Sequence, residues 1–370
     1  MRSKISKPGQ PGPKGSSFFS DMISPRFNPA AVLDISNSDQ KVLIISDFHM
    51  GIGRRDDLAP NRELLLSLLE KRYLAEGWYL VLNGDIEELQ RYSLPHIREN
   101  WSPLYAIFDR FAAEKRLYKI VGNHDAALLF EKNYPYPLYE VLRIETGSLP
   151  IYVYHGHQSS RVYTDYNHLI GVSLRYVLKP FGIRNVSSAR SPYKRFFVEK
   201  KAYAFSLKNN CISIIGHTHR ALFASLGRFD YIKFEIERLC RDYPASQGAE
   251  RERIAREVQA LRQELGKLGR VERRHVLRQS LYGDELPVPC LFNSGSAIGR
   301  RGINAIELDR QSIALVYWFN EGKGKHFISR GSYDVDTIDG TPCRRGVLNR
   351  DRLEYVKSRI ELLGSRTEIL

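Results

Sequence analysis

Five short polar blocks in this chain of 370 residues combine carboxylate, amide and imidazole side chains. Carboxylate and amide oxygens are hard donors and imidazole nitrogens are borderline ones, a mixture that suits Mn²⁺, Zn²⁺ or Fe ions. Because no thiolate is among them, the blocks argue against a structural zinc cage. The blocks are Asp47-Phe48-His49, Gly84-Asp85, Gly122-Asn123-His124-Asp125, His155-Gly156-His157 and Gly216-His217-Thr218-His219.

The spacing inside the blocks lets several side chains reach one ion. Residues i and i+2 of an extended segment point to the same side. Asp47 and His49 can therefore bind a common metal, and His217 and His219 can face a common site. The glycines that open three blocks (Gly84, Gly122 and Gly216) permit sharp turns and close approach of the chain at these points.

Each block follows an apolar run of the kind that forms a buried strand. Strands that alternate with helices predict an α/β sheet whose functional loops lie at the carboxyl ends of the strands. Five blocks in this order and context are not expected by chance, so the sequence predicts a metal site. The runs are Lys41–Ser46, Trp78–Asn83, Leu117–Val121, Ile151–Tyr154 and Cys211–Ile215, with helical spacing in Asn61–Tyr73 and Leu104–Ala113.

The ordered set resembles the calcineurin-like metallophosphoesterase superfamily, whose pattern is DxH, GD, GNH(D/E), H and GHxH. The resemblance extends from Lys41 to about Phe319, and NSGS (Asn293–Ser296), followed by two strand-like runs, is similar to the closing segment of that family. It implies an α/β fold, a four-layer α/β/β/α sandwich of two mixed sheets with helical insertions, and two metals at the strand ends.

The resemblance also implies roles for individual residues. His124 matches the catalytic histidine and Asp125 its orienting partner. His155 is preferred over His157 as a ligand because it follows the strand directly, and His157 would lie behind the ligands or touch substrate. One metal would be held by Asp47, His49, Asp85 and His219, and the other by Asp85, Asn123, His155 and His217, with Asp85 bridging.

The implied activity is metal-dependent hydrolysis of a phosphomonoester, phosphodiester or pyrophosphate. Two divalent ions, Mn²⁺ first with Zn²⁺ or Fe as alternatives, would clamp the phosphoryl group and generate a bridging hydroxide that attacks phosphorus. His124 would protonate the leaving oxygen. Three alternatives stay open: a nuclease, an enzyme at the membrane surface similar to the UDP-2,3-diacylglucosamine pyrophosphatases, and a non-catalytic scaffold of the same fold. The pyrophosphatase branch usually has Arg where this chain has His124.

Composition limits the classes further. Lys and Arg number 56 against 42 Asp and Glu, a net charge of +14, which favours an anionic partner. A hydrophobic content of 42% excludes a wholly disordered or fibrous protein. Four scattered cysteines indicate no disulfide framework, and we find neither a signal sequence nor a membrane-spanning run. A cytoplasmic location is expected, with peripheral membrane contact as an alternative.

Domain boundaries follow from changes in composition. We expect a flexible basic tail over residues 1–28, the metallophosphoesterase domain over 29–330 and a C-terminal extension over 331–370. Within the domain, 160–205 is rich in basic and aromatic residues and 245–282 contains a charged helix. The helix at 249–279 packs on its own domain, forms a hairpin, or binds a partner or second copy.

The basic and aromatic insertion has two interpretations. It is a solvated connector, or a cap that attracts a phosphorylated small-molecule or lipid-linked substrate; binding of nucleic acid is not favoured. The candidate substrate-binding residues are Arg54, Arg55, His157, Arg190, Lys194, Arg195 and Arg220.

Overall fold

The computed structural model describes residues 30–37, 39–53, 56–159, 192–223, 236, 239–240, 242–271, 288–299, 301–322 and 335–364. The side chains of residues 192–196 are not among those described. The predicted tail over 1–28 and residues 160–191 of the basic insertion therefore lie outside the described residues.

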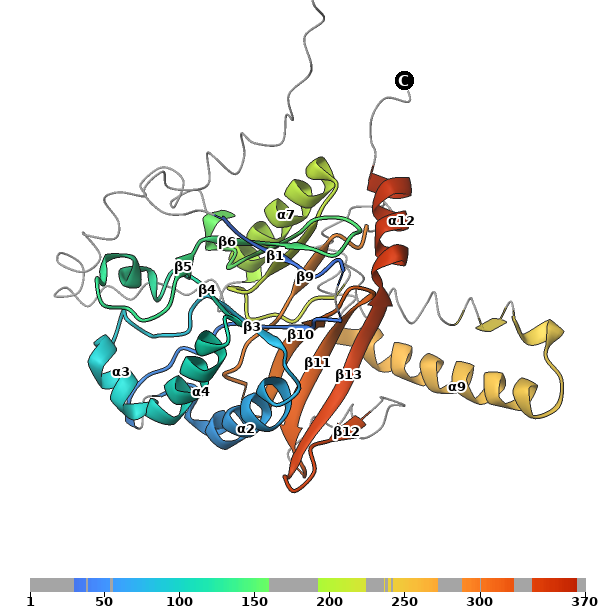
Figure 1. Cartoon of the computed structure of the whole chain (residues 1–370). Helices are drawn as coiled ribbons and strands as arrows, with labels where there is room; N and C mark the ends of the chain where they lie inside the picture. The colour runs from blue at the N-terminus through green and yellow to red at the C-terminus, as the bar shows by residue number, and fades with distance from the viewer. Residues whose placement is uncertain are drawn as a thin grey trace, which may run out of the picture.

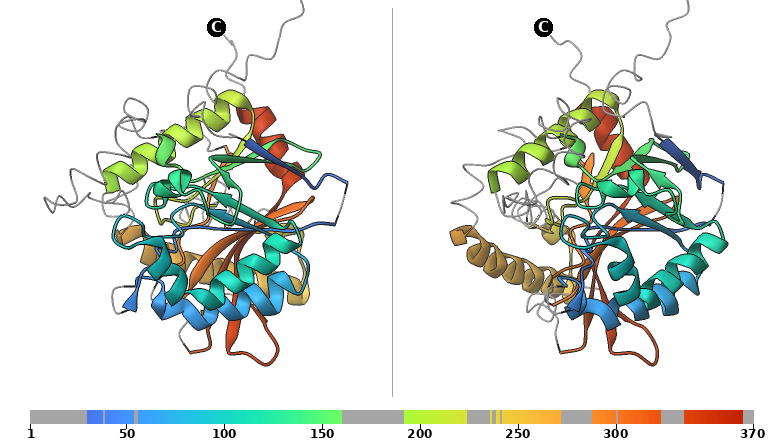
Figure 2. Two further views of the ribbon diagram at one scale, coloured as in Figure 1. Left: turned by 60° about the vertical axis from the view of Figure 1, so that its left-hand side comes forward. Right: turned by 90° about the vertical axis from the view of Figure 1, so that its left-hand side faces the viewer.

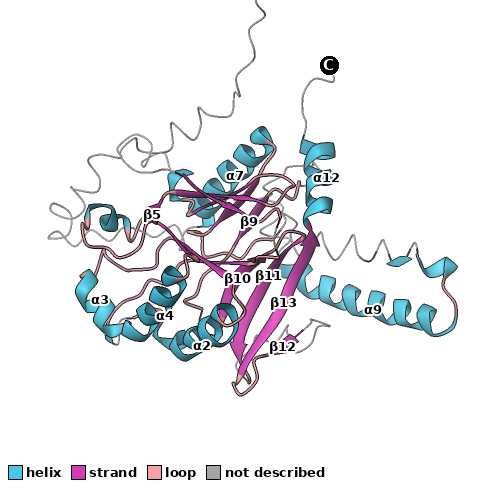
Figure 3. Cartoon of the chain, viewed as in Figure 1, coloured by secondary structure: helices cyan, strands magenta, loops and turns pink. Residues whose placement is uncertain are grey.

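Two mixed β-sheets form the centre of the molecule (Figures 1 and 3). The eight-stranded sheet runs in the order β12 (Val335–Thr337), β13 (Cys343–Arg352), β11 (Ser312–Asn320), β10 (Ile303–Leu308), β2 (Val42–Ile45), β3 (Tyr79–Asn83), β4 (Leu117–Ile120), β5 (Leu138–Tyr139). The five-stranded sheet runs in the order β1 (Ala30–Asp34), β6 (Val141–Glu145), β7 (Ile151–Tyr154), β8 (Ile212–Ile215), β9 (Leu291–Asn293).

Helices cover the outer face of each sheet, which completes the four expected layers (Figure 2). Apolar residues of α2, the π-helical turn η3, α3 and α4 pack on the eight-stranded sheet, and those of α7 and α12 pack on the side of the five-stranded sheet. Their bounds are α2 (Arg62–Leu68), η3 (Leu69–Leu74), α3 (Leu94–Asn100), α4 (Ser102–Ala113), α7 (Pro192–Asn209) and α12 (Leu353–Gly364).

Strand β2 is apolar throughout because both of its faces are buried. Leu43 and Ile45 belong to the cluster on the helix side of the sheet, whereas Val42 and Ile44 belong to the cluster between the sheets. Both faces are buried, so the strand has no polar alternation. The parallel neighbours β2, β3 and β4 end at the same edge, and a polar block follows each of them there.

Residues 343–360 belong to the two-sheet domain, so the predicted boundary at residue 330 is wrong. Strand β13 pairs with β11 from Ser312 opposite Arg352 to Asn320 opposite Cys343. Helix α12 buries Leu353, Val356 and Ile360 in the cluster that includes the inter-sheet residues. The charged sequence CRRGVLNRDR does not have the apolar pattern of a strand. Backbone pairing with β11 rather than an apolar face places β13 in the sheet.

The two insertions differ in their relation to the core. Tyr203 and Phe205 of α7, which belong to the basic and aromatic insertion, are buried against the sandwich, so this part of the insertion forms an outer layer. Helix α9 (Gly248–Val271) confirms the charged helix up to residue 271 and extends outward from the two sheets (Figure 1). None of the described helices is long and apolar enough to cross a bilayer.

Removal of β13 and α12 tests the corrected boundary. We expect a chain that ends at Pro342 to lose cooperative unfolding, because it exposes the edge of β11 and removes the packing of Leu353, Val356 and Ile360. Each of these buried side chains contributes about 1.5–3 kcal/mol, against a total stability of about 5–15 kcal/mol. Thermal unfolding followed by circular dichroism measures the effect.

A chain that ends at Gly364 is the matched control, because it keeps every described element. It should unfold at the temperature of the full chain. Cooperative unfolding of the shorter chain at that same temperature would show that residues 343–364 are an extension after all.

Candidate functional site

The backbone is strained within three of the five polar blocks. Among the described residues other than glycine, seven have positive φ, and five of these are predicted metal ligands. The left-handed region costs such residues about 1–3 kcal/mol each and persists only where the surroundings enforce it, as at functional sites. The five are Asp47 (φ 56°), His49 (φ 45°), Asp85 (φ 54°), His217 (φ 63°) and His219 (φ 55°).

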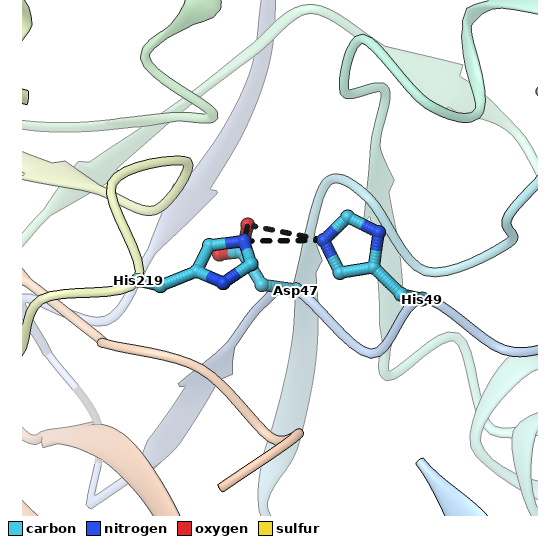
Figure 4. Close-up of side chains that lie close together, drawn as sticks. All are labelled: Asp47, His49 and His219. Carbon is cyan, nitrogen blue, oxygen red and sulfur yellow. Dashed lines mark hydrogen bonds and ion pairs between the residues drawn. The ribbon is translucent and has the colours of Figure 1, made fainter. Parts of the chain in front are cut away.

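One group of donors comes from the first and last blocks. The carboxylate of Asp47 and the imidazoles of His49 and His219 are turned toward one another (Figure 4). The Nε2 atom of His219 lies 3.1 Å from Oδ1 of Asp47 and 3.1 Å from Nε2 of His49. The other oxygen of Asp47 accepts hydrogen bonds from the Ser46 hydroxyl and the backbone N–H of His217, so Oδ1 is the oxygen presented to the group.

A second group joins Asp85 to His155 and His217. The Nε2 atom of His155 lies 3.1 Å from Oδ2 of Asp85. The Nδ1 atom of His155 is 2.8 Å from the backbone carbonyl oxygen of Asn83, which fits donation from Nδ1 and leaves the lone pair of Nε2 to face the group. The adjacent His157 is buried behind this group, with its ring 5.5 Å from that of His155.

Asp85 connects the two groups. The oxygen that approaches His155 also lies 3.9 Å from Nε2 of His49, while the other oxygen accepts a hydrogen bond from the backbone N–H of His124 at 2.8 Å. Burial would raise the pKa of Asp85, but the positive potential of His155, His124 and His49 holds it well below its usual value. The carboxylate is therefore ionised and central.

Three buried donor atoms test whether the residues present fit metal ions. Oδ1 of Asp47, Oδ1 of Asn123 and Nε2 of His155 are buried and have no hydrogen-bond partner. Such atoms cost about 1–3 kcal/mol each unless something satisfies them. Two ligands bonded at about 2.1 Å to one tetrahedral or octahedral ion lie roughly 3.0–3.4 Å apart. The observed separations of 3.1 Å agree, so the donor set fits divalent ions.

The three glycines predicted to allow close approach do so. A Cβ on Gly122 would lie 2.2 Å from Oδ1 of Asp85, and one on Gly84 would lie 2.5 Å from Nδ1 of His155. A Cβ on Gly216 would lie 2.8 Å from Oδ2 of Asp47. Any side chain at these positions would displace a candidate ligand.

The prediction that Asp125 orients His124 is wrong. Nδ1 of His124 contacts both carboxylate oxygens of Glu88, at 2.9 and 3.0 Å. The carboxylate of Asp125 instead accepts hydrogen bonds from the backbone N–H groups of Ile86 and Gly122 and pairs with Lys119. Adjacent residues point in different directions, so the orienting carboxylate comes from another loop.

Glu88 also contacts Nδ1 of His49 at 3.1 Å, so one carboxylate joins a candidate ligand to the candidate acid. Burial would raise the pKa of Glu88, but its contacts with His124 and His49 lower it to about 2. Burial would lower the pKa of His124, but the charges of Asp85 and Glu88 raise it to about 9. These two carboxylates favour the protonated ring, and bound divalent cations would oppose that shift.

A family model of calcineurin-like phosphoesterases matches residues 40–243, a span that contains all five blocks. The chain belongs to the calcineurin-like phosphoesterase family. As a member of this family it is a hydrolase that acts on phosphoester bonds.

Two solved structures are among those to which the phosphoesterase chain is similar. YfcE, a phosphoesterase from E. coli, is 13% identical, with 74% of this chain and 91% of that chain covered and a TM-score of 0.30. Vacuolar protein sorting 29 from Cryptosporidium parvum is 14% identical, with 77% and 93% covered and a TM-score of 0.32. No curated protein gives a significant sequence match.

Sequence reasoning missed Glu88 in this phosphoesterase. Its signal in the sequence is a carboxylate three residues after Asp85 in GDIEEL, whereas the family resemblance points to Asp125, the residue next to His124. Only the fold shows which of the two carboxylates meets the ring.

Of the substrate-binding residues predicted for the phosphoesterase, the structure describes the side chains of His157 and Arg220. Arg220 forms an ion pair with Glu199 of α7, which also accepts a hydrogen bond from Thr218. This pair fastens α7 to the last block. Arg54, Arg55 and Arg190 lie outside the described residues, as do the side chains of Lys194 and Arg195.

Neutralising the shared carboxylate tests the site. Asp85→Asn should lose at least one metal ion and nearly all turnover while the fold survives, because one oxygen faces both donor groups. Metal content is measured by elemental analysis after dialysis, and folding by thermal unfolding. Asp56→Asn is the control, since Asp56 is a buried carboxylate that contacts Leu58 and Trp101 rather than the donor groups. Full metal content and wild-type hydrolysis in Asp85→Asn would contradict the assignment.

Proposed function

We propose that this phosphoesterase uses a dinuclear metal centre to hydrolyse a phosphomonoester, phosphodiester or pyrophosphate. The observation that carries the proposal is the position of Asp85. Its Oδ2 atom lies 3.1 Å from His155 and 3.9 Å from His49, which belong to different donor groups. A carboxylate in that position is suited to bridge two ions.

The two donor groups suit divalent ions, with Mn²⁺ the first expectation and Zn²⁺ or Fe as alternatives. When bound, the ions would supply Lewis-acid stabilisation of the phosphoryl oxygens and a water acidic enough to attack phosphorus near neutral pH. Asp85 would serve both positions. The first position would use Asp47, His49 and His219, and the second Asn123, His155 and His217.

His124 would act as the general acid. Because Glu88 engages Nδ1, Nε2 is the nitrogen from which a proton can pass to the leaving oxygen. Glu88 would hold the ring in one orientation and stabilise its protonated form. The imidazole is partly exposed, with 17% of the side-chain surface accessible, so a leaving group can reach it.

A phosphorylated small-molecule or lipid-linked substrate is the proposed partner. A panel of phosphomonoesters, phosphodiesters, nucleotide sugars and single-stranded DNA, assayed with Mn²⁺, tests the proposal. We expect hydrolysis of at least one small phosphoester by the wild type and none by Asp85→Asn. Hydrolysis of DNA alone would favour a nuclease, and no metal-dependent turnover on any substrate would overturn the proposal.

The acid role predicts a dependence on the leaving group. His124→Ala should slow esters with poor leaving groups by about 10²–10⁴-fold, because these need a proton in the transition state. Aryl phosphates should be slowed less, and the metal content should stay unchanged. The measurement is kcat/KM across a series of leaving-group pKa values. His96→Ala, at an exposed histidine that contacts Ser93, is the control. Equal losses across the series would exclude the acid role.

A further inference from the structure

A lysine lies fully buried behind the candidate metal centre. Lys119 is on β4, on the face that also carries Leu117, and its side chain has no exposed surface. Burial of an ammonium group in an apolar layer is costly unless charged partners compensate for it. The position of the lysine in this layer therefore needs an explanation.

Two carboxylates compensate the charge. The Nζ atom of Lys119 lies 2.5 Å from Oδ2 of Asp125 and 3.0 Å from Oε2 of Glu87. The other oxygen of Glu87 accepts hydrogen bonds from the hydroxyls of Tyr105 and Tyr134, at 2.9 and 2.7 Å. Burial would lower the pKa of Lys119, but Asp125 and Glu87 raise it, so the ammonium stays charged.

The network joins the two loops that carry candidate ligands of the second metal position. Glu87 belongs to the loop after β3, which carries Asp85, and Asp125 belongs to the loop after β4, which carries Asn123. Asp125 strengthens this connection, because it also accepts the backbone N–H of Ile86 at 2.9 Å. Lys119 thus forms an ion pair with a carboxylate of each loop and connects the two.

The tolerance at this junction is small. A Cβ on Gly122 would overlap Oδ1 of Asp85, and that same oxygen accepts the backbone N–H of His124 at 2.8 Å. Any relative shift of the two loops therefore changes where Asp85 lies with respect to Asn123. Residues behind metal ligands commonly change metal affinity 10–100-fold when they are replaced.

We propose that Lys119 is a positioning residue that fixes the separation of Asp85 and Asn123 and thereby sets the affinity of the second metal position. The inference rests on the dinuclear centre of the proposed function. Electrostatics alone gives the opposite sign, because removal of a buried cation would strengthen the binding of another cation. A loss of metal affinity on removal of Lys119 therefore identifies positioning.

The same sheet holds a matched network far from the donor groups. Arg345 of β13 is 3% exposed and pairs with Glu307 and Asp336, and Glu307 accepts a hydrogen bond from Tyr73. Glu307 pairs with Leu43 near the amino end of β2, whereas Asp47 follows the carboxyl end of that strand. A buried cation, two carboxylates and a tyrosine are common to both networks, but only one joins the ligand loops.

The experiment compares four variants of the full chain with the wild type. Lys119→Met and Arg345→Met remove each cation, and Lys119→Met/Glu87→Gln and Arg345→Met/Glu307→Gln also remove one carboxylate, so that net charge is restored. Mn²⁺ binding to chelator-treated protein is measured by calorimetry. Electron paramagnetic resonance of the loaded protein reports whether two Mn²⁺ ions are coupled, and thermal unfolding reports stability.

We expect both Lys119 variants to bind the second Mn²⁺ about 10–100-fold more weakly and to lose the coupled signal. Both Arg345 variants should lose stability but keep two coupled ions. The double Lys119 variant, which leaves fewer unpaired buried charges, should recover stability without recovering affinity. If Lys119→Met does not fold, the double variant decides.

Some results would overturn the role of Lys119 but leave the proposed dinuclear centre intact. These are wild-type Mn²⁺ affinity in the Lys119 variants, or equal losses of affinity in the Lys119 pair and the Arg345 pair. Failure of both Lys119 variants to fold while the Arg345 pair folds would show a purely structural role and would also overturn it. A wild-type protein that binds only one Mn²⁺ would overturn the dinuclear centre itself, and the inference with it.

Discussion

Buried donor atoms held about 3 Å apart are the constraint on which the structure depends. Oδ1 of Asp47 and Nε2 of His155 each lie 3.1 Å from another candidate ligand and have no hydrogen bond. A chain free to relax would turn these atoms toward water or toward backbone partners. Left-handed backbone at Asp47 and Asp85 adds strain to that cost. The free energy gained by burying the apolar layers must offset both the buried donor atoms and the backbone strain. Bound cations would remove much of the cost of the buried donor atoms.

The two-sheet architecture meets this constraint by supplying donors from two directions. Strands β2, β3 and β4 of one sheet and β7 and β8 of the other end near a common point, and the core between the sheets fixes their separation. Glycines at the turns (Gly84, Gly122 and Gly216) then let the loops approach one another without steric overlap. The rigid part of the fold thus sets the distance, and the loops supply the chemistry.

Neighbouring carboxylates near the candidate ligands contact different groups and so have different roles. In GDIEEL, Asp85 faces the donor groups, Glu87 turns into the core toward Lys119, and Glu88 reaches His49 and His124. Asp125 holds its own loop and meets Lys119 rather than the histidine beside it. Acidic residues within four positions of one another therefore have three different roles, each set by the face of the turn from which it projects.

The sequence by itself determined the strands that are unbroken apolar runs, the polar blocks that follow them and the glycines within those blocks. These features depend on local composition and on the spacing of apolar residues along the chain. The sequence did not determine that Glu88 rather than Asp125 meets His124, that Arg220 pairs with Glu199, or that β13 pairs with β11 in the eight-stranded sheet. Those contacts join residues that are far apart in the chain or adjacent but oppositely directed. Only tertiary structure brings such groups within hydrogen-bonding distance, since a hydrogen bond depends on position in space and not on spacing along the chain.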